Sequence, residues 1–167
     1  MNNKTLIKNA TIVNEGASVI SDILIEGQII SKIDKEINIE GSIKIINADN
    51  LTLIPGMIDD QVHFREPGLT HKGDIYSESR AAVAGGVTSF IEMPNTIPNT
   101  VNDSALFQKI EIAKSKSFAN FSFMFGGTNS NLNDILKVDK SQIAGIKIFL
   151  GSSTGNMLVD NLSLIHI

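Results

Sequence analysis

The chain has 167 residues, a formal net charge of −4 and 42% hydrophobic residues, which predicts a globular protein of one domain, or of one small domain and part of another. With no basic excess, no Trp and one Tyr, it lacks the positive surface and stacking side chains typical of nucleic-acid-binding proteins. The absence of cysteine excludes disulfides and thiolate metal sites. A metal would therefore need histidine, carboxylate or modified side chains as ligands.

The N-terminal text "MNNKTLIKNATIV" lacks the charged and then apolar build of a signal peptide. No apolar stretch approaches the roughly 18 residues of a membrane span. From these two features we expect a cytoplasmic protein.

Residues 4 to about 50 read as short strands rich in Ile and Val. "TLIKNATIV" (5–13) is the first, and "ILIEGQIISKI" (23–33) is broken by a predicted hairpin turn at Glu26-Gly27. "SIKIINA" (42–48) continues the pattern. We predict a small all-β module over residues 1–52.

Strands and helices alternate in the remainder, residues 53–167. The predicted strands are "LTLIPGMID" (51–59), "VTSFIEMP" (87–94), "FSFMFGG" (121–127) and "GIKIFL" (145–150). The predicted helices are "YSESRAAVAGG" (76–86), a segment with Asp103 as its candidate cap that ends at residue 116, and "NLNDILK" (131–137). This α/β alternation predicts a parallel sheet covered on both faces, either a doubly wound open sheet or a (β/α)8 barrel.

Polar side chains fall where ligands collect in parallel sheets, at the carboxyl ends of the strands. His63 and Arg65 follow the first strand, and Asn95 follows the second. Each has an ordinary alternative: a lone histidine is more often structural, an arginine is usually solvated, and Asn95 suits a turn. A guanidinium can also clamp a carboxylate through two parallel hydrogen bonds.

Lys147 lies within the fourth predicted strand, between Ile146 and Ile148. Burying its ammonium without a partner would be costly, so one interpretation is an edge strand whose lysine reaches water. The other is a buried lysine with a depressed pKa that reacts with carbon dioxide to give a carbamate able to bridge two metals. The sequence leaves both open.

Three further features carry less weight. "GSSTGN" (151–156) lacks the Gly-Lys-Ser/Thr ending of a phosphate loop and reads as a strand-to-helix connection. His71 is expected at the surface, and His166 lies in a tail without a predicted partner.

Four motifs together resemble the cyclic amidohydrolases, and most closely the dihydroorotases. They are "PGMIDDQVHFREPG", "THKGDI", "RAAVAGGVTSFIEMPNT" and "GIKIFLGSS". The resemblance implies a (β/α)8 TIM-type barrel flanked by a small β-sandwich and a binuclear metal centre, usually zinc. It also implies reversible hydrolysis of dihydroorotate to N-carbamoyl-L-aspartate in pyrimidine biosynthesis.

By position, the resemblance makes His63 the second histidine of a metal-binding His-x-His pair. It makes Arg65 and Asn95 the residues that hold the substrate carboxylate, and Lys147 the carboxylated lysine that bridges the metals. The first histidine is replaced by Gln61, whose neutral amide is a poor zinc ligand. Either Asp59 or water compensates, or one metal is weak or missing.

Relatives of this family are much longer than 167 residues. Their later histidines and the aspartate that serves as general base are missing here, so we predict the N-terminal part of a dihydroorotase that is inactive alone. One alternative is a non-catalytic scaffold that binds a partner such as aspartate transcarbamoylase, or that forms a homo-oligomer. Others are an allantoinase or hydantoinase relative, which would not need Arg65 because its ring is uncharged, and an unrelated half-barrel binding module.

Overall fold

The computed structural model describes residues 4–151, 157–161 and 163. The chain forms two compact units, residues 1–55 and 56–167, so the boundary follows Pro55, whereas the sequence placed it at 52/53. Among the described residues, no helix has the length and apolar character that a membrane span requires.

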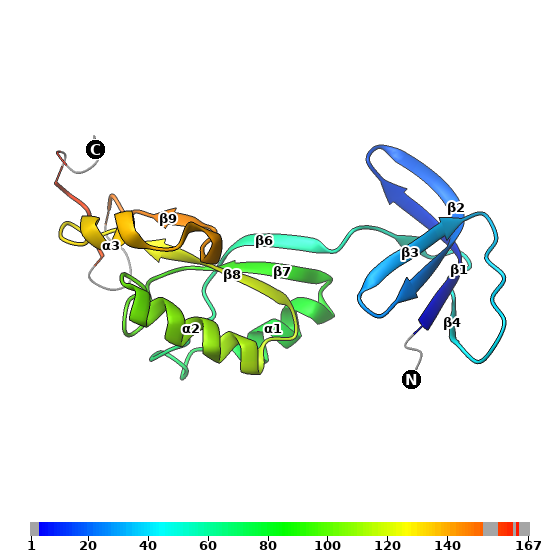
Figure 1. The fold of residues 1–167 in the computed structure, drawn as a ribbon, viewed down its shortest axis with the longest axis horizontal. Coiled ribbons are helices and arrows are strands. Elements are labelled where there is room, and N and C mark those ends of the chain that lie inside the picture. Colours follow the sequence, from blue (N-terminus) through cyan, green and yellow to red (C-terminus); the bar gives the residue numbers. More distant parts are fainter. Residues whose placement is uncertain (1–3, 152–156, 162, 164–167) are drawn as a thin grey trace. The chain divides into compact units, whose positions relative to one another are not determined.

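The first unit is a β module (Figure 1). Its strands are β1 (Lys4–Asn14), β2 (Ala17–Glu26), β3 (Ile29–Asp34), β4 (Lys44–Asn47) and β5 (Thr52–Leu53). β3, β2 and β1 pair antiparallel, whereas β4 and β5 both run parallel to β1. The predicted turn at Glu26-Gly27 is confirmed, because Gly27 adopts a φ of 64° between β2 and β3.

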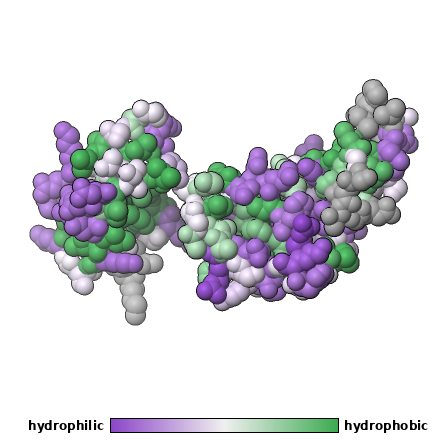
Figure 2. Space-filling model, turned by 180° about the vertical axis from the view of Figure 1, so that it is seen from behind, coloured by the Kyte–Doolittle hydropathy of each residue, from purple (hydrophilic) through white to green (hydrophobic). Residues whose placement is uncertain are grey.

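This module has two small apolar clusters and several exposed hydrophobic side chains. One cluster contains Leu6, Leu24 and Ile37, and the other contains Ala10, Ile23 and Ala48. Large side chains stay outside both: Ile29, Ile33 and Ile45 are each more than half exposed. In Figure 2 the surface of the module is mixed, with green hydrophobic areas beside purple hydrophilic ones.

The second unit alternates strands and helices, as predicted. Its elements are β6 (Met57–Val62), α1 (Ile75–Ala84), β7 (Val87–Glu92), α2 (Asp103–Lys116), β8 (Asn120–Gly126), α3 (Leu132–Lys137), a 3-10 turn (Lys140–Gln142) and β9 (Gly145–Lys147). All pairs are parallel, in the order β6-β7-β8-β9. A doubly wound sheet reverses its strand order, so this unbroken order favours the barrel alternative.

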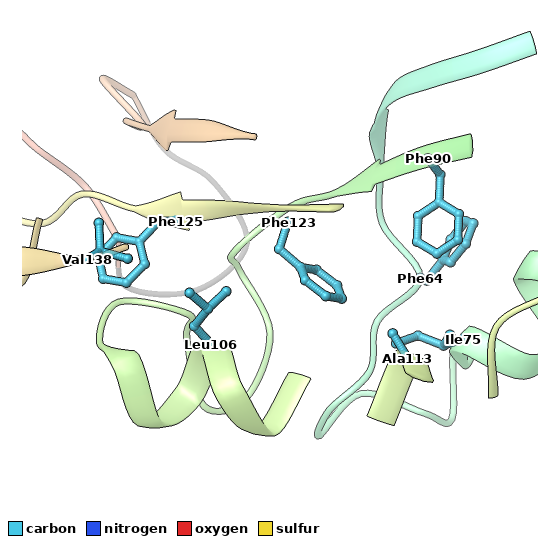
Figure 3. Close-up of a cluster of buried hydrophobic side chains, with 8 residues drawn as sticks. All are labelled: Phe64, Ile75, Phe90, Leu106, Ala113, Phe123, Phe125 and Val138. Carbon is cyan, nitrogen blue, oxygen red and sulfur yellow. The ribbon is translucent and has the colours of Figure 1, made fainter. Parts of the chain in front are cut away.

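An aromatic core joins the sheet to its helices (Figure 3). Phe90 and Phe123 point from neighbouring strands toward Leu106 and Ala113 of α2, and all four are at most 3% exposed. The helices α1 and α2 lie on the same side of the sheet in Figure 1, which corrects the expectation of helices on both faces. A barrel explains the difference, because its helices cover only the outer face.

Three local predictions are corrected. "LTLIPGMID" is not one strand: it divides at Pro55 into β5 and β6, which belong to different units, since proline cannot donate to a ladder. The cap of α2 is Asn102, not Asp103, because the Asn102 side chain accepts a hydrogen bond from Ala105 N at 2.9 Å. The last strand ends at Lys147 instead of continuing to residue 150.

Candidate functional site

The predicted site residues stand at the carboxyl ends of three parallel strands. His63 follows β6 directly, Asn95 lies three residues beyond β7, and Lys147 is the last residue of β9. Because parallel strands end at the same edge of their sheet, these side chains share one rim. The fold thus brings together residues that are up to 84 positions apart in the sequence.

Gln61 and Lys147 interact across this rim. The Lys147 ammonium donates a hydrogen bond to the Gln61 Oε1 atom at 3.4 Å and lies 5.4 Å from the centre of the Phe149 ring. Lys147 is partly exposed on a strand that pairs, among the described strands, only with β8. This is closer to the edge-strand interpretation than to a lysine buried without a partner.

His63 sits in a partly buried, positively charged environment. Burial is the main cause that lowers the pKa of the imidazole below its ordinary value of 6.5, and the charge of Arg65 lowers it further. A hydrogen bond with the Asn95 side chain opposes this, while Lys147 and Lys109 add to the lowering. Around neutral pH the imidazole is therefore uncharged and able to accept a proton or a hydrogen bond.

Arg65 has an unusual backbone. Its φ is 69°, a left-handed conformation that non-glycine residues seldom adopt. Its carbonyl accepts a hydrogen bond from Leu69 N at 3.0 Å, and Ile97 N donates to Pro67 O at 3.1 Å. Gly68 completes the contact, because a Cβ there would collide with the Ile97 carbonyl. The loops that carry Arg65 and Asn95 are thus packed against each other.

Two buried carboxylates beside the rim were not predicted. Glu66 accepts a hydrogen bond from Ile75 N at 3.0 Å and pairs with Lys116. Glu92, the last residue of β7, forms an ion pair with Lys109 of α2. The sequence held a signal for the second pair, since Lys109 lies three residues after Leu106 on the apolar face of its helix.

The zinc expected from the family resemblance can be tested against these donors. No group of three or more His, Cys, Asp or Glu side chains converges within the described residues. The rim offers one imidazole, His63, beside an amide and an ammonium that are bonded to each other, and Asp59 accepts the N–H of Gln61. This set does not fit a metal ion on its own, because zinc requires about four N, S or carboxylate ligands.

The remaining sequence features lie away from the rim or outside the description. His71 is exposed, as expected. His166 and residues 152–156 of the "GSSTGN" segment lie outside the described residues. A hollow of about 440 Å³ lies at α2 and β8, has a mainly apolar lining that includes Phe107 and Phe121, and contains none of the five predicted site residues.

Comparison with known proteins places this geometry in context. No family model matches the chain. A dihydroorotase of Methanosarcina acetivorans is 36% identical over 155 residues, which cover 92% of this chain and 33% of that protein. An allantoinase of Solibacter usitatus is 37% identical over 149 residues, 89% of this chain and 32% of that protein.

A solved structure of a related enzyme is also similar to this chain. The L-hydantoinase of Arthrobacter aurescens has a TM-score of 0.87 and 28% identity, and the match covers 95% of this chain and 35% of that one. The second unit is accordingly the beginning of a (β/α)8 barrel that is preceded by the β module. The chain belongs to the cyclic amidohydrolase family, and it spans about a third of the length of the relatives it matches, at their N-terminal end.

Proposed function

We propose that this chain is the N-terminal part of a dihydroorotase-type cyclic amidohydrolase, cytoplasmic, with a substrate that carries its own carboxylate. The reaction would be the reversible hydrolysis of dihydroorotate to N-carbamoyl-L-aspartate. The observation that carries the proposal is the cluster of Arg65, Asn95 and His63 at one rim. Zinc binding by the whole protein stays a prediction, since His63 supplies only one of the required ligands.

The cluster suits an anionic ligand. The guanidinium of Arg65 can donate two parallel hydrogen bonds to a carboxylate, and the Asn95 amide can donate another. Lys147 adds a second positive charge at the same rim, while His63 stays neutral and can accept a hydrogen bond from a ring N–H. An uncharged hydantoin or allantoin ring would use neither cation, although allantoinases are as similar to this chain as dihydroorotases are.

Binding measurements on the 167-residue chain test this proposal. N-carbamoyl-L-aspartate should bind, and Arg65→Ala should weaken it by about tenfold or more, because a charge-assisted pair is lost. Arg65→Lys, which keeps the charge but not the two parallel bonds, should recover part of the affinity. Equal affinity for allantoin, unchanged by Arg65→Ala, would contradict the proposal and favour the allantoinase alternative.

A scaffold role is the second candidate, and one observation favours it. The Gln61 amide occupies a position where the family pattern has a metal-binding histidine, and it is bonded to Lys147. A scaffold would bind its partner, aspartate transcarbamoylase for instance, equally well with Arg65→Ala. In either case we expect the chain alone to show no dihydroorotate turnover, and turnover in proportion to its concentration would refute that expectation.

A further inference from the structure

A buried ion pair lies beneath the rim and has no role in the function proposed above. Glu92 and Lys109 are 1% and 0% exposed, and their charged groups are in direct contact. Moving two charges out of water costs free energy, and the attraction between the charges often does no more than offset this cost. Well-packed apolar residues would therefore stabilise the fold equally well. We therefore looked for parts of the structure that the two charged groups hold in place.

The lysine end of the pair organises the loop after β7. The Lys109 Nζ atom donates to Met93 O at 2.7 Å and lies 3.4 Å from Thr100 Oγ1. Met93 and Thr100 flank Asn95, so one ammonium closes both ends of the loop that carries it. The Phe123 ring, whose centre is 5.3 Å from Nζ, covers the ammonium.

The glutamate end holds the loop after β6. The backbone N–H groups of Arg65 and Phe64 lie close enough to the Glu92 carboxylate to lower its pKa, against the raising effect of burial. Arg65 is also the residue with the left-handed φ of 69°. A strained conformation of this kind persists only where surrounding contacts impose it, and a fixed buried carboxylate is such a contact.

We propose that Glu92 and Lys109 are positioning residues, which together hold Arg65 and Asn95 in the geometry that receives a carboxylate ligand. The pair contacts both loops, and the close approach of Gly68 to Ile97 joins them at a second place. The inference that this geometry serves a ligand rests on the proposed function. The inference that the pair imposes the backbone of Arg65 does not.

The test uses the 167-residue chain and the double variant Glu92→Gln/Lys109→Met, which keeps the volume and removes both charges. We expect a folded protein by circular dichroism, in which the Arg65 N–H exchanges with solvent about tenfold faster relative to Ile91 N–H in β7, because the buried negative charge that faces this N–H is gone. The Asn95 side-chain amide signals should move in the NMR spectrum. The affinity for N-carbamoyl-L-aspartate should fall by about tenfold.

Asp22→Asn in the β module is the matched control. Asp22 is also a buried carboxylate that accepts backbone N–H groups, those of Asn9 and Ile37, and its replacement should leave the Arg65 exchange and the ligand affinity unchanged. If the double variant does not fold, Glu92→Asp withdraws the carboxylate by one methylene, keeps its charge, and should still accelerate Arg65 exchange.

The outcomes separate the two proposals. Native Arg65 exchange in a folded double variant, or in Glu92→Asp, overturns the positioning role. If the unaltered chain binds no N-carbamoyl-L-aspartate, the proposed function fails, while the exchange and NMR measurements on ligand-free protein still decide the positioning role. Accelerated exchange with unchanged affinity would show that the pair holds the backbone but does not serve the ligand, which also overturns the inference.

Discussion

The β module and the parallel unit each bury a carboxylate, but they surround it differently. In the β module, Asp22 accepts hydrogen bonds from the N–H groups of Asn9 and Ile37 at 2.9 and 3.0 Å. The Lys8 side chain, whose ammonium lies 3.8 Å from Asp22, is 32% exposed. In the parallel unit, Glu92 faces a lysine with no exposed surface. Burial raises the pKa of Glu92, against the opposing effect of Lys109, and burial lowers the pKa of Lys109.

The two buried carboxylates stabilise different parts of the protein. Asp22 fastens one loop of a sheet, and its lysine stays in contact with water. Glu92 and Lys109 are enclosed beneath His63, Arg65 and Asn95, which are the residues predicted to meet a ligand. We therefore regard the β module as a structural unit and the parallel unit as the one that holds the candidate site.

The largest expected effect is on the core of the parallel unit. Phe123, 1% exposed, packs against α2 and covers Lys109, so Phe123→Ala should cost about 3–5 kcal/mol of stability through lost burial and a cavity. Hydrogen exchange should show the loss in residues 56–151 and leave β1 and β2 protected. Equal loss of protection in both units would contradict this view of two separate units, because it would show that they unfold together.

The next effect is on the β module. Asp22→Ala leaves two backbone N–H groups without their acceptor, which should cost about 2–3 kcal/mol. Denaturation followed by NMR signals of β1 and β2 measures this loss. Binding of N-carbamoyl-L-aspartate should be unchanged, and weaker binding would show that the module contributes to the site.

A smaller effect is expected at the start of α2. Asn102→Ala removes the side chain that accepts from Ala105 N, which should cost about 1 kcal/mol of stability. Asn102→Asp should recover most of it, since aspartate caps helices equally well. A urea titration of both variants measures the difference, and a larger cost for Asp103→Ala would instead restore Asp103 as the cap.

The smallest effect is electrostatic. NMR titration should give His63 a pKa below 6.5, and Arg65→Gln should raise it, because one of the causes of the lowering is removed. A histidine with a lowered native pKa binds fewer protons than it does in the unfolded chain, so the stability of the parallel unit should decrease as the pH falls through 6.5. An unchanged His63 pKa in Arg65→Gln would show that the charge of Arg65 does not act on the imidazole.

Most of the strands and helices, and the polar residues at the rim, could be predicted from the sequence. Runs rich in Ile and Val identified the strands, and the Gly85-Gly86 pair ended α1. Position after a strand selected His63, Arg65 and Asn95, and an ammonium inside an apolar strand selected Lys147. The structure places these residues at one edge because parallel strands bring their carboxyl ends together whatever lies between them, while their roles toward a metal or a substrate stay predictions. The family resemblance added a metal-dependent hydrolysis, for which the described residues alone do not supply enough metal ligands.

The partners of these residues could not be predicted, because they come from distant parts of the chain. The bond between Gln61 and Lys147 spans 86 positions, and the bond between Lys116 and Glu66 spans 50. The burial of Lys109 depends on Glu92 facing the same helix, which a local pattern cannot establish. Periodicity in the sequence shows that a side chain faces the core, but the distance to its partner depends on how the strands and helices pack.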